Sequence, residues 1–445
     1  MNPREFRRNR SNELSLTRLQ KAMRDNGVGR LYAKRLAEND NSKNQVYLGP
    51  DLSTLNILPV HGIVQDLNKS ELLKAHLEFS WLDEQGSVAN APGAQLILYP
   101  QYPEVRLSGF LKGCSDAPSE LMTIRQQGRV LFLGITQSGK IIAFVASPES
   151  KLVREFEEMR GLQQIGVFLE IPVQGLDPRH TLLEELKRVH LLNWINSKRL
   201  KADGTIVNCN SSNCGGYTLE AELGVRPNGF SEPDFLGWEI KQHGVENFER
   251  PESGTPITLM TPEPTAGYYK DKGVDRFIRK FGYKDKNRRD RLNFSGRHFA
   301  NQVCGATGLK LALIGYDQHT GRIDDLSGGL SLLTPEGEPA ATWQYTDIMR
   351  HWNRKHAQAA YVPAMKRTDP QLSYKFGSII RMAEGTDFLL FLKAVSLGKL
   401  YYDPGIKMEN VSTSHPIIKR RSQFRMASRD IPALYKKVER VNLTG

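Results

Sequence analysis

The chain has 445 residues, of which 39% are hydrophobic and 25% charged, which is typical of folded globular proteins and long enough for two domains. No apolar run is long enough to span a membrane, and the N-terminal segment lacks the apolar stretch of a secretory signal, so we expect a cytoplasmic protein with no membrane partner. The formal net charge of +12 favours a polyanionic partner over charge that serves solubility alone.

The first part of the chain, residues 1–175, is predicted to form a β-rich domain. The runs 130–136 and 140–145 flank Gln137-Ser138-Gly139, which is a hairpin signal. Several short strands separated by turns favour a compact barrel or sandwich. Such a domain could be a structural or dimerisation module, or a second DNA reader, and no motif decides between them. Further strands are expected at 96–100, 104–110 and 164–171, and short helices at 15–23 and 70–77.

The second part, residues 180–445, is predicted to form an α/β domain that follows a linker at Pro172–Pro178. Thr181 can cap a helix over 181–197, and the polar residues 200–213 are expected to form turns. Because strand-like and helix-like segments alternate irregularly, we expect helices packed on a mixed central sheet. Other expected elements are strands at 309–314, at 330–333 and near Leu400, and helices at 217–223, 346–357 and 388–397.

One motif in this domain carries chemistry. Residues 232–241 read EPDFLGWEIK, which places Asp234 just before a short strand and Glu239 and Lys241 within it. Strand side chains alternate between faces, so Glu239 and Lys241 share one face. Gly237 permits a sharp approach that brings Asp234 to the same point. Two carboxylates and a lysine could hold a divalent metal ion and a water beside a phosphodiester, although a half-buried strand with solvated charges has the same pattern.

A helix precedes the motif and adds a third carboxylate. Residues 217–223 are helical in pattern and end at Gly224, a fitting C-terminal cap. Glu220 lies on this helix, fourteen residues before Asp234. Glu222 lies close by and could be confused with it.

The runs GGYTLEAELG (215–224) and SEPDFLGWEIK (231–241) resemble the MvaI/BcnI restriction endonuclease family and, more distantly, the mismatch-repair nicking endonuclease MutH. Both have the PD-(D/E)xK nuclease fold, and the resemblance covers about the C-terminal 260 residues. It implies metal ligation by Asp234, Glu239 and the carbonyl of Ile240, with Lys241 at the attacking water. It also implies that Glu220 supports the metal site.

The same resemblance implies a Mg²⁺-dependent type II restriction endonuclease that acts as a monomer on duplex DNA at CCNGG-type sites, without an organic cofactor. Some restriction endonucleases of the two-site kind, type IIE, carry an N-terminal effector domain with a B3-like pseudobarrel. Residues 1–175 resemble such a domain in their length and in their expected content of short strands. The alternatives are a repair-type nicking endonuclease that needs partner proteins, and a non-catalytic DNA-binding protein with a decayed nuclease domain.

Two basic runs in the second domain favour DNA binding. Residues 270–297 contain eleven Lys or Arg against four Asp, and residues 415–440 contain eight against two acids. Interleaved aromatic residues strengthen this interpretation over a merely solvated face. The expected DNA-binding residues are His415, Lys419, Arg420, Arg421 and Arg425; the three arginines are candidate groove readers, and contact with phosphates alone is the alternative.

The remaining candidate metal ligands give weaker signals. Cys114, Cys209, Cys214 and Cys304 lack zinc-site spacing and are expected to be free thiols in a reducing cytoplasm. His351 and His356 are five residues apart on a predicted helix and do not share a face as an i, i+4 pair would. We expect both histidines at the surface or close to DNA.

Overall fold

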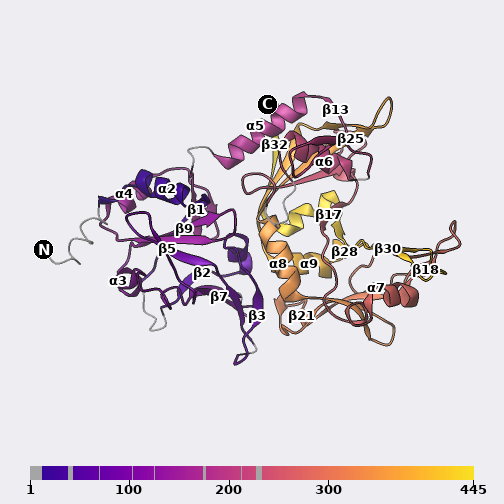
Figure 1. The fold of residues 1–445 in the computed structure, drawn as a ribbon, viewed down its shortest axis with the longest axis horizontal. Helices are drawn as coiled ribbons and strands as arrows, with labels where there is room; N and C mark the ends of the chain where they lie inside the picture. The colour runs from indigo at the N-terminus through magenta and orange to yellow at the C-terminus, as the bar shows by residue number, and fades with distance from the viewer. Residues whose placement is uncertain are drawn as a thin grey trace. The chain divides into compact units, whose positions relative to one another are not determined.

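The computed structural model describes residues 13–38, 44–69, 71–102, 104–124, 126–173, 177–211, 213–226 and 233–445. Residues 174–176 of the expected linker and residues 231–232 of the motif run lie outside the described residues. The chain forms two compact units, Met1–His180 and Thr181–Gly445, and each is described by itself (Figure 1). Within the described ranges, no helix is both long and apolar enough to cross a membrane.

The first unit is rich in strands, which form two sheets. All neighbouring strands are antiparallel except β10 and β5. The predicted hairpin is confirmed, because β9 and β10 pair across the turn at Gly139. One sheet has the order β11 (Gln164–Ile165), β12 (Phe168–Ile171), β1 (Val28–Arg35), β9 (Val130–Thr136), β10 (Ile141–Ala146), β5 (Phe79–Leu82), β6 (Val88–Asn90), and the other has the order β2 (Val46–Gly49), β8 (Glu104–Ser108), β7 (Gln95–Tyr99), β4 (Leu73–His76), β3 (Ile63–Gln65).

Helices α2 (Leu16–Asp25) and α4 (Lys151–Glu158) contribute to the core of this unit with β1, β9 and β10. Ser15 caps α2 by accepting a hydrogen bond from the main-chain N–H of Arg18. The expected helix at 70–77 is wrong, because Leu73 and Ala75 are buried and alternate with Lys74 and His76, the period of a strand. The unit also contains α3 (Ser119–Thr123) and the 3-10 turn η1 (Leu52–Asn56).

The second unit is built on a mixed six-stranded sheet, as expected. Strand β16 runs parallel to β25, whereas the other neighbours are antiparallel. Residues 200–213 were expected to form turns, but their first part belongs to the hairpin of β14 (Lys198–Leu200) and β15 (Ile206–Asn208). The sheet order is β13 (Trp194–Asn196), β26 (Ser373–Phe376), β25 (Gln358–Arg367), β27 (Ile379–Thr386), β32 (Tyr435–Asn442), with β16 (Glu239–Gly244) on β25.

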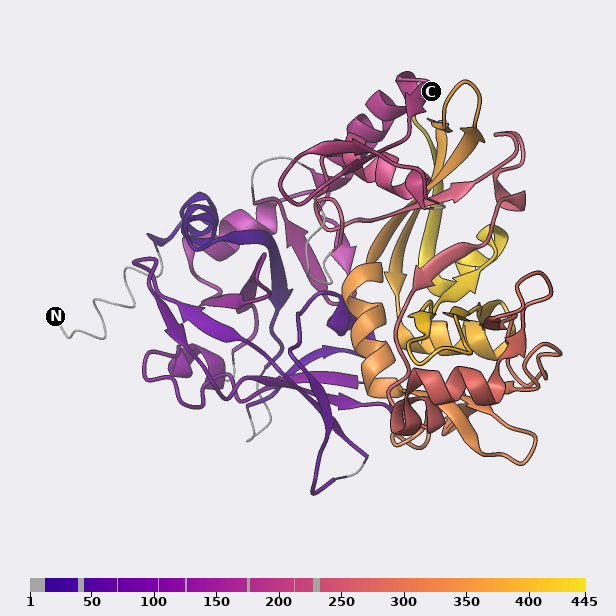
Figure 2. The same ribbon diagram turned by 45° about the vertical axis from the view of Figure 1, so that its right-hand side comes forward.

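Helices α5 (Pro178–Leu191) and α6 (Cys214–Glu222) share a core with this sheet, in which Leu186 and Leu219 join Ile240 of β16. Helix α5 begins at Pro178 rather than at Thr181, because proline is well suited to the first helical position. It ends at Leu191, and the edge strand β13 follows. The expected helices at 346–357 and 388–397 are confirmed as α8 (Tyr345–His356) and α9 (Phe388–Ser396), which contact each other (Figure 2).

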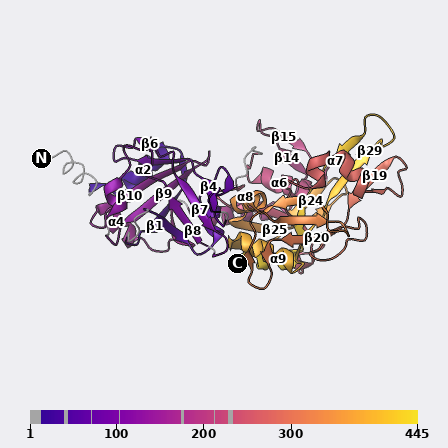
Figure 3. The same cartoon turned by 90° about the horizontal axis from the view of Figure 1, so that it is seen from below.

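Aromatic side chains pack together among the remaining elements of the second unit. Phe277 of helix α7 (Tyr268–Phe281) packs against Phe294, and Trp343, Tyr402 and Phe424 pack together. The smaller sheets of this unit have the orders β17 (Ile257–Met260), β31 (Phe424–Met426), β28 (Leu400–Tyr402); β18 (Tyr283–Lys284), β19 (Arg291–Ser295), β29 (Gly405–Glu409), β30 (Ile417–Lys419); β20 (Lys310–Ile314), β23 (Gly329–Leu333), β24 (Pro339–Gln344); and β21 (Tyr316–Asp317), β22 (Arg322–Ile323) (Figure 3). The unit also contains the 3-10 turns η2 (Pro251–Ser253) and η3 (Ser428–Leu434).

Candidate active site

A tight turn places Asp234 beside strand β16. Phe235 and Trp238 exchange main-chain hydrogen bonds of 2.9 and 2.8 Å across the two residues Leu236 and Gly237. Both have positive φ, +46° and +89°, which is the type I′ hairpin turn. A leucine in this conformation costs roughly 1 kcal/mol because its Cβ approaches the main chain. The turn folds the chain back so that Oδ2 of Asp234 accepts a 2.9 Å hydrogen bond from the N–H of Ile240.

Glu239 and Lys241 form a buried ion pair on one face of β16. Lys241 Nζ donates to Oε1 of Glu239 at 2.6 Å, and the Glu239 side chain is only 1% exposed. The other oxygen of Glu239, Oε2, is buried and has no hydrogen-bond partner among the described residues. Burial opposes the charged form of Glu239, but the positive charges of Lys241 and Lys355 lower its pKa below the usual value.

The pKa values of the other two carboxylates of the predicted site, Asp234 and Glu220, are also shifted by burial and by neighbouring charges. Burial and the negative charge of Glu239 raise the pKa of Asp234 to about 7. Burial is also the main cause of the raised pKa of Glu220, and the charges of Lys241 and Glu239 act on it as well. Three acids and one lysine therefore influence one another's charge in a poorly solvated part of the chain, and a divalent cation would offset the excess of negative charge.

The donor set fits Mg²⁺ better than a closed metal cage. Across the described ranges, no group of three or more His, Cys, Asp or Glu side chains is arranged to hold a metal ion. Asp234, Glu239 and the carbonyl of Ile240 offer two carboxylates and one main-chain oxygen. Mg²⁺ in phosphate chemistry usually takes one or two carboxylates and keeps several waters. The unpartnered Oε2 of Glu239 is an acceptor suited to such an ion.

The two neighbouring glutamates of α6 have different surroundings. Glu222 forms ion pairs with Lys198 and, more loosely at 3.7 Å, with Arg188. Glu220 interacts electrostatically with Asp234, Glu239 and Lys241. The described geometry therefore brings Glu220, rather than Glu222, together with the motif residues.

Two further groups lie beside the motif: Tyr361, which sequence reasoning missed, and His356, whose place there it did not predict. Tyr361 lies opposite Lys241 in the parallel register of β16 and β25, and its hydroxyl is 2.9 Å from that of Tyr435. His356 was expected at the surface or close to DNA; it is not at the surface but buried, stacks on Trp352 with ring centroids 4.1 Å apart, and has Nε2 3.1 Å from the carbonyl of Leu259. Only the sheet register and the helix packing bring these residues to the site, and the linear sequence carries no such signal.

Four of the expected DNA-binding residues lie between β29 and β31, with Lys419 at the end of β30, and Arg425 lies within β31. His415, Lys419 and Arg420 are exposed, and Lys419 pairs with Glu409 at 3.2 Å. Arg421 is also exposed, and its Nε donates to Gln423. Arg425 is less accessible, because it donates to Asp403 at 2.8 Å and to the carbonyl of Pro256.

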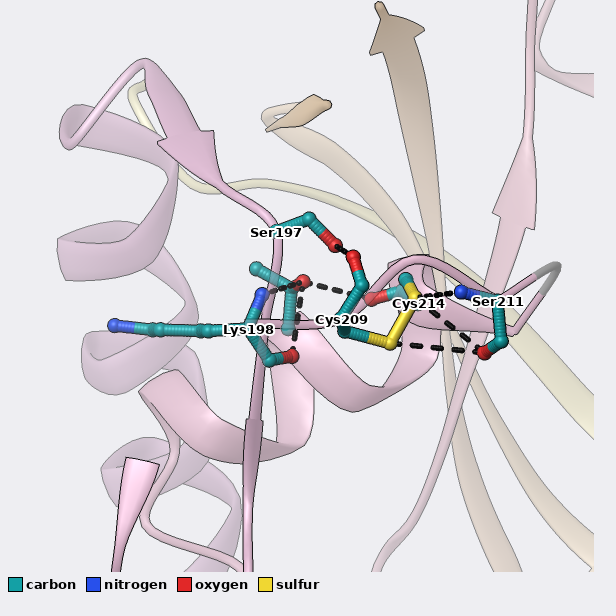
Figure 4. Close-up of a disulfide and its surroundings, with 6 residues drawn as sticks. Ser197, Lys198, Cys209, Ser211 and Cys214 are labelled. Atoms are coloured by element: carbon teal, nitrogen blue, oxygen red, sulfur yellow. Dashed lines mark hydrogen bonds between the residues drawn. A yellow bond between two sulfur atoms is a disulfide. The ribbon is translucent and has the colours of Figure 1, made fainter. Parts of the chain in front are cut away.

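A disulfide fixes the start of α6, which corrects the expectation of four free thiols. Cys209, after β15, is bonded to Cys214, the first residue of α6 (Figure 4). Ser211 donates its N–H to Sγ of Cys214 within the same loop. Cys114 and Cys304 are free. The expectation rested on the redox state of the presumed compartment, whereas the five-residue spacing lets a tight loop bring the two thiols together.

Comparisons with known proteins give one family match and weak likenesses to solved structures. The sequence model of the MvaI/BcnI restriction endonuclease family matches residues 183–435. Among solved structures, a complex of restriction endonuclease MvaI with cognate DNA is 15% identical, covers 60% of this chain and 98% of its own, and has a TM-score of 0.45. MvaI in the absence of DNA is 14% identical, with the same coverage and a TM-score of 0.33. No curated protein sequence matches the chain.

Proposed function

The chain belongs to the MvaI/BcnI restriction endonuclease family, and we propose that it is a Mg²⁺-dependent type II enzyme that hydrolyses phosphodiester bonds of duplex DNA at a short specific site. One observation carries this proposal. Glu239 is buried and bonded to Lys241 through one oxygen, while its other oxygen has no hydrogen-bond partner among the described residues. A buried acceptor in this state needs a cation or a donor, and a phosphodiester-cleaving site supplies the cation.

We assign metal ligation to Asp234, Glu239 and the carbonyl of Ile240. Mg²⁺ bound there would neutralise charge on the scissile phosphate and lower the pKa of a nearby water. Lys241 remains protonated, because Glu239 and Asp234 outweigh the effect of burial and raise its pKa. It therefore acts as a hydrogen-bond donor that orients the attacking water, and not as a base. Glu220 tunes the charge of this site from α6.

Specificity is proposed to reside in the second basic run. His415, Lys419, Arg420 and Arg421 are exposed, so they can reach DNA without first breaking buried contacts. Arginine pairs bidentately with guanine in the major groove, which suits a CCNGG-type target. Arg425 is held by Asp403 and Pro256, so in our proposal it supports the surface more than it reads bases.

For the first unit we propose a type IIE effector role with a B3-like pseudobarrel. A hollow of about 300 Å³ in this unit is lined by Lys34, Arg35, Arg106 and Arg129, with Glu38 as an acidic neighbour. Concave basic surfaces focus a field that attracts DNA. Arg129 donates to three main-chain carbonyls and shapes the hollow. Lys34, Arg35 and Arg106 also line it, with Arg35 paired to Glu157 and Arg106 to Glu104, so DNA phosphates would have to share or displace these carboxylates.

The decisive experiment is digestion of a plasmid library with Mg²⁺, with EDTA as the control, followed by sequencing of the ends. Cuts in both strands at one short sequence, by the purified chain alone, support the proposal. Single-strand nicks that require added partner proteins would identify a repair-type nicking enzyme. Sequence-specific retention of DNA with no cleavage in any divalent metal would identify a non-catalytic DNA-binding protein.

A further inference from the structure

We propose that Leu236 is a DNA-contacting residue, which packs against the sugar and base edge of a nucleotide that flanks the scissile phosphate. This inference rests on the proposed nuclease function and adds a residue that the metal motif does not include. It starts from an unfavourable residue choice in the turn between Asp234 and Glu239.

Leu236 adopts a conformation that the rest of the described chain reserves for asparagine and glycine. Its φ is +46°, and the other non-glycine residues with positive φ in the described ranges are Asn44, Asn193, Asn301 and Asn410. Asparagine, aspartate and glycine favour this first central position of a type I′ turn, and leucine does not. An unfavourable choice that persists at one position calls for a compensating interaction.

The fold of the second unit covers only about half of Leu236. The Leu236 side chain is 49% exposed, whereas the neighbouring Trp238 is 1% exposed and packs in the core. The turn closes through main-chain hydrogen bonds between Phe235 and Trp238, which do not depend on the side chain at 236. The leucine side chain is therefore available to an external apolar surface.

The position of the turn identifies that surface. Leu236 is two residues from Asp234 and three from Glu239, so its Cα lies within about 7 Å of the Asp234 Cα, a reach comparable to the spacing of neighbouring nucleotides. Phosphates offer leucine no favourable contact, whereas the deoxyribose and base edges are apolar. Leucine side chains are known to pack against or between base steps in the minor groove. DNA held at Asp234 and Glu239 would thus meet Leu236 through a flanking nucleotide.

Substitutions at position 236 distinguish the effect of the side chain on the stability of the turn from its effect through contact with DNA. Leu236→Asn and Leu236→Gly suit the type I′ turn, so their melting temperatures should equal or exceed that of the wild type. Their single-turnover cleavage should fall about tenfold or more, because the apolar contact is lost. Leu236→Met keeps the apolar side chain in the same strained turn and should cleave within about threefold of wild type. Leu397→Asn is the matched control, since Leu397 is 60% exposed at the end of α9 and should cleave normally.

Two further substrates, each with an abasic nucleotide on one side of the cut, complete a double-mutant cycle between Leu236 and the flanking base. If Leu236 contacts a base edge, the difference between wild type and Leu236→Asn should shrink on one of these substrates. An unchanged difference on both substrates, or wild-type cleavage by Leu236→Asn, would overturn this inference alone. Failure of the wild type to cleave any duplex would instead refute the proposed function, so the two failures can be told apart.

Discussion

Lys241 Nζ lies 2.6 Å from Oε1 of Glu239, and the second carboxylate oxygen of Glu239 is buried without a hydrogen-bond partner among the described residues. The lysine lowers the pKa of the glutamate, and the glutamate raises that of the lysine, so each keeps the other charged despite burial. This pairing sets up one acceptor for a cation and one donor for a water on the same strand face.

Removing any of the three motif side chains should stop cleavage. Asp234→Asn and Glu239→Gln remove carboxylate charge at the proposed metal, and Lys241→Ala removes the water donor, so each should lower the cleavage rate more than about 100-fold. DNA binding in Ca²⁺, measured by fluorescence anisotropy, should remain close to wild type. Glu246→Gln, an exposed residue just beyond β16, is the control. Cleavage at the wild-type rate by either carboxylate variant would remove these residues from the chemistry.

Substitution of the two glutamates of α6 should affect different properties, the cleavage rate for Glu220 and the stability for Glu222. Glu220→Gln should lower the cleavage rate by about tenfold with little change in melting temperature, because it acts on the charge of the metal site. Glu222→Gln loses ion pairs with Lys198 and Arg188, so it should lower stability by at most about 1 kcal/mol and leave cleavage intact. Cleavage rate and thermal unfolding are measured on both variants. The opposite pattern would show that Glu222 is the helix residue of the site.

Substitutions of Arg420 and Arg425 in the second basic run should have different effects, because Arg425 is held by partners within the protein whereas Arg420 is exposed. Arg420→Ala, at an exposed position, should weaken DNA binding and reduce the slope of log affinity against log salt by about one if it contacts a phosphate. If it reads a base, the loss should be confined to one position of the target. Arg425→Ala leaves Asp403 without its 2.8 Å partner, so we expect a lower melting temperature as its first effect. Binding titrations at several salt concentrations on a set of single-base variants measure these outcomes.

Burial of His356 predicts a pH dependence of stability. Burial lowers the pKa of this histidine from 6.5 to about 4 in the folded chain. As the pH falls, the unfolded chain takes up the proton first. The contribution of neutral His356 to the free energy of unfolding is therefore fully present above pH 6.5 and is lost progressively as the pH falls to 4. Below pH 4 this histidine causes no further loss. The shift corresponds to about 3 kcal/mol. Urea unfolding from pH 7.5 to 4 should show the decline. His356→Gln should remove this histidine's share of the decline and leave that of His243, whose pKa burial also lowers to about 4, whereas His319→Gln, at an exposed position, should change neither.

The local part of this structure could be predicted from the sequence. Strand β9 and helices α8 and α9 were expected within a residue or two, because their apolar periodicity and the cap at Asp387 are encoded locally. The segment at 70–77 was misassigned because its buried residues alternate over only four positions, too few to distinguish a strand from a helix.

The wider surroundings of the site depend on tertiary register and could not be predicted. Tyr361 reaches Lys241 only because β25 lies parallel to β16, and these strands are more than a hundred residues apart. His356 is buried because its ring stacks on Trp352 and its Nε2 forms a hydrogen bond with the carbonyl of Leu259. The sequence motif placed the acids in order, but the turn conformation at Leu236 and the single hydrogen bond to Glu239 emerged only from the folded chain.

The first unit gives the last prediction, which concerns communication between two DNA copies. If its basic hollow binds a target copy, the intact chain should cut a two-site plasmid faster than a one-site plasmid, and a short target duplex in trans should stimulate one-site cleavage. The reason is linkage: a bound duplex can favour the cleaving state only if it binds that state more tightly. A fragment of residues 181–445 contains the motif and both basic runs, so it should cut without this stimulation.

The hollow itself supplies the matched variants. Arg106→Ala should abolish stimulation while leaving the basal one-site rate unchanged, because Arg106 lies in the first unit and lines the hollow. Arg18→Ala, a change at an exposed cation of α2 in the same unit, should keep the stimulation. Residues 1–180 alone should bind the duplex with an affinity that falls steeply as salt rises. Equal rates on both plasmids, with no DNA binding by residues 1–180, would leave the first unit a structural module, because no second binding event would then exist to be coupled to cleavage.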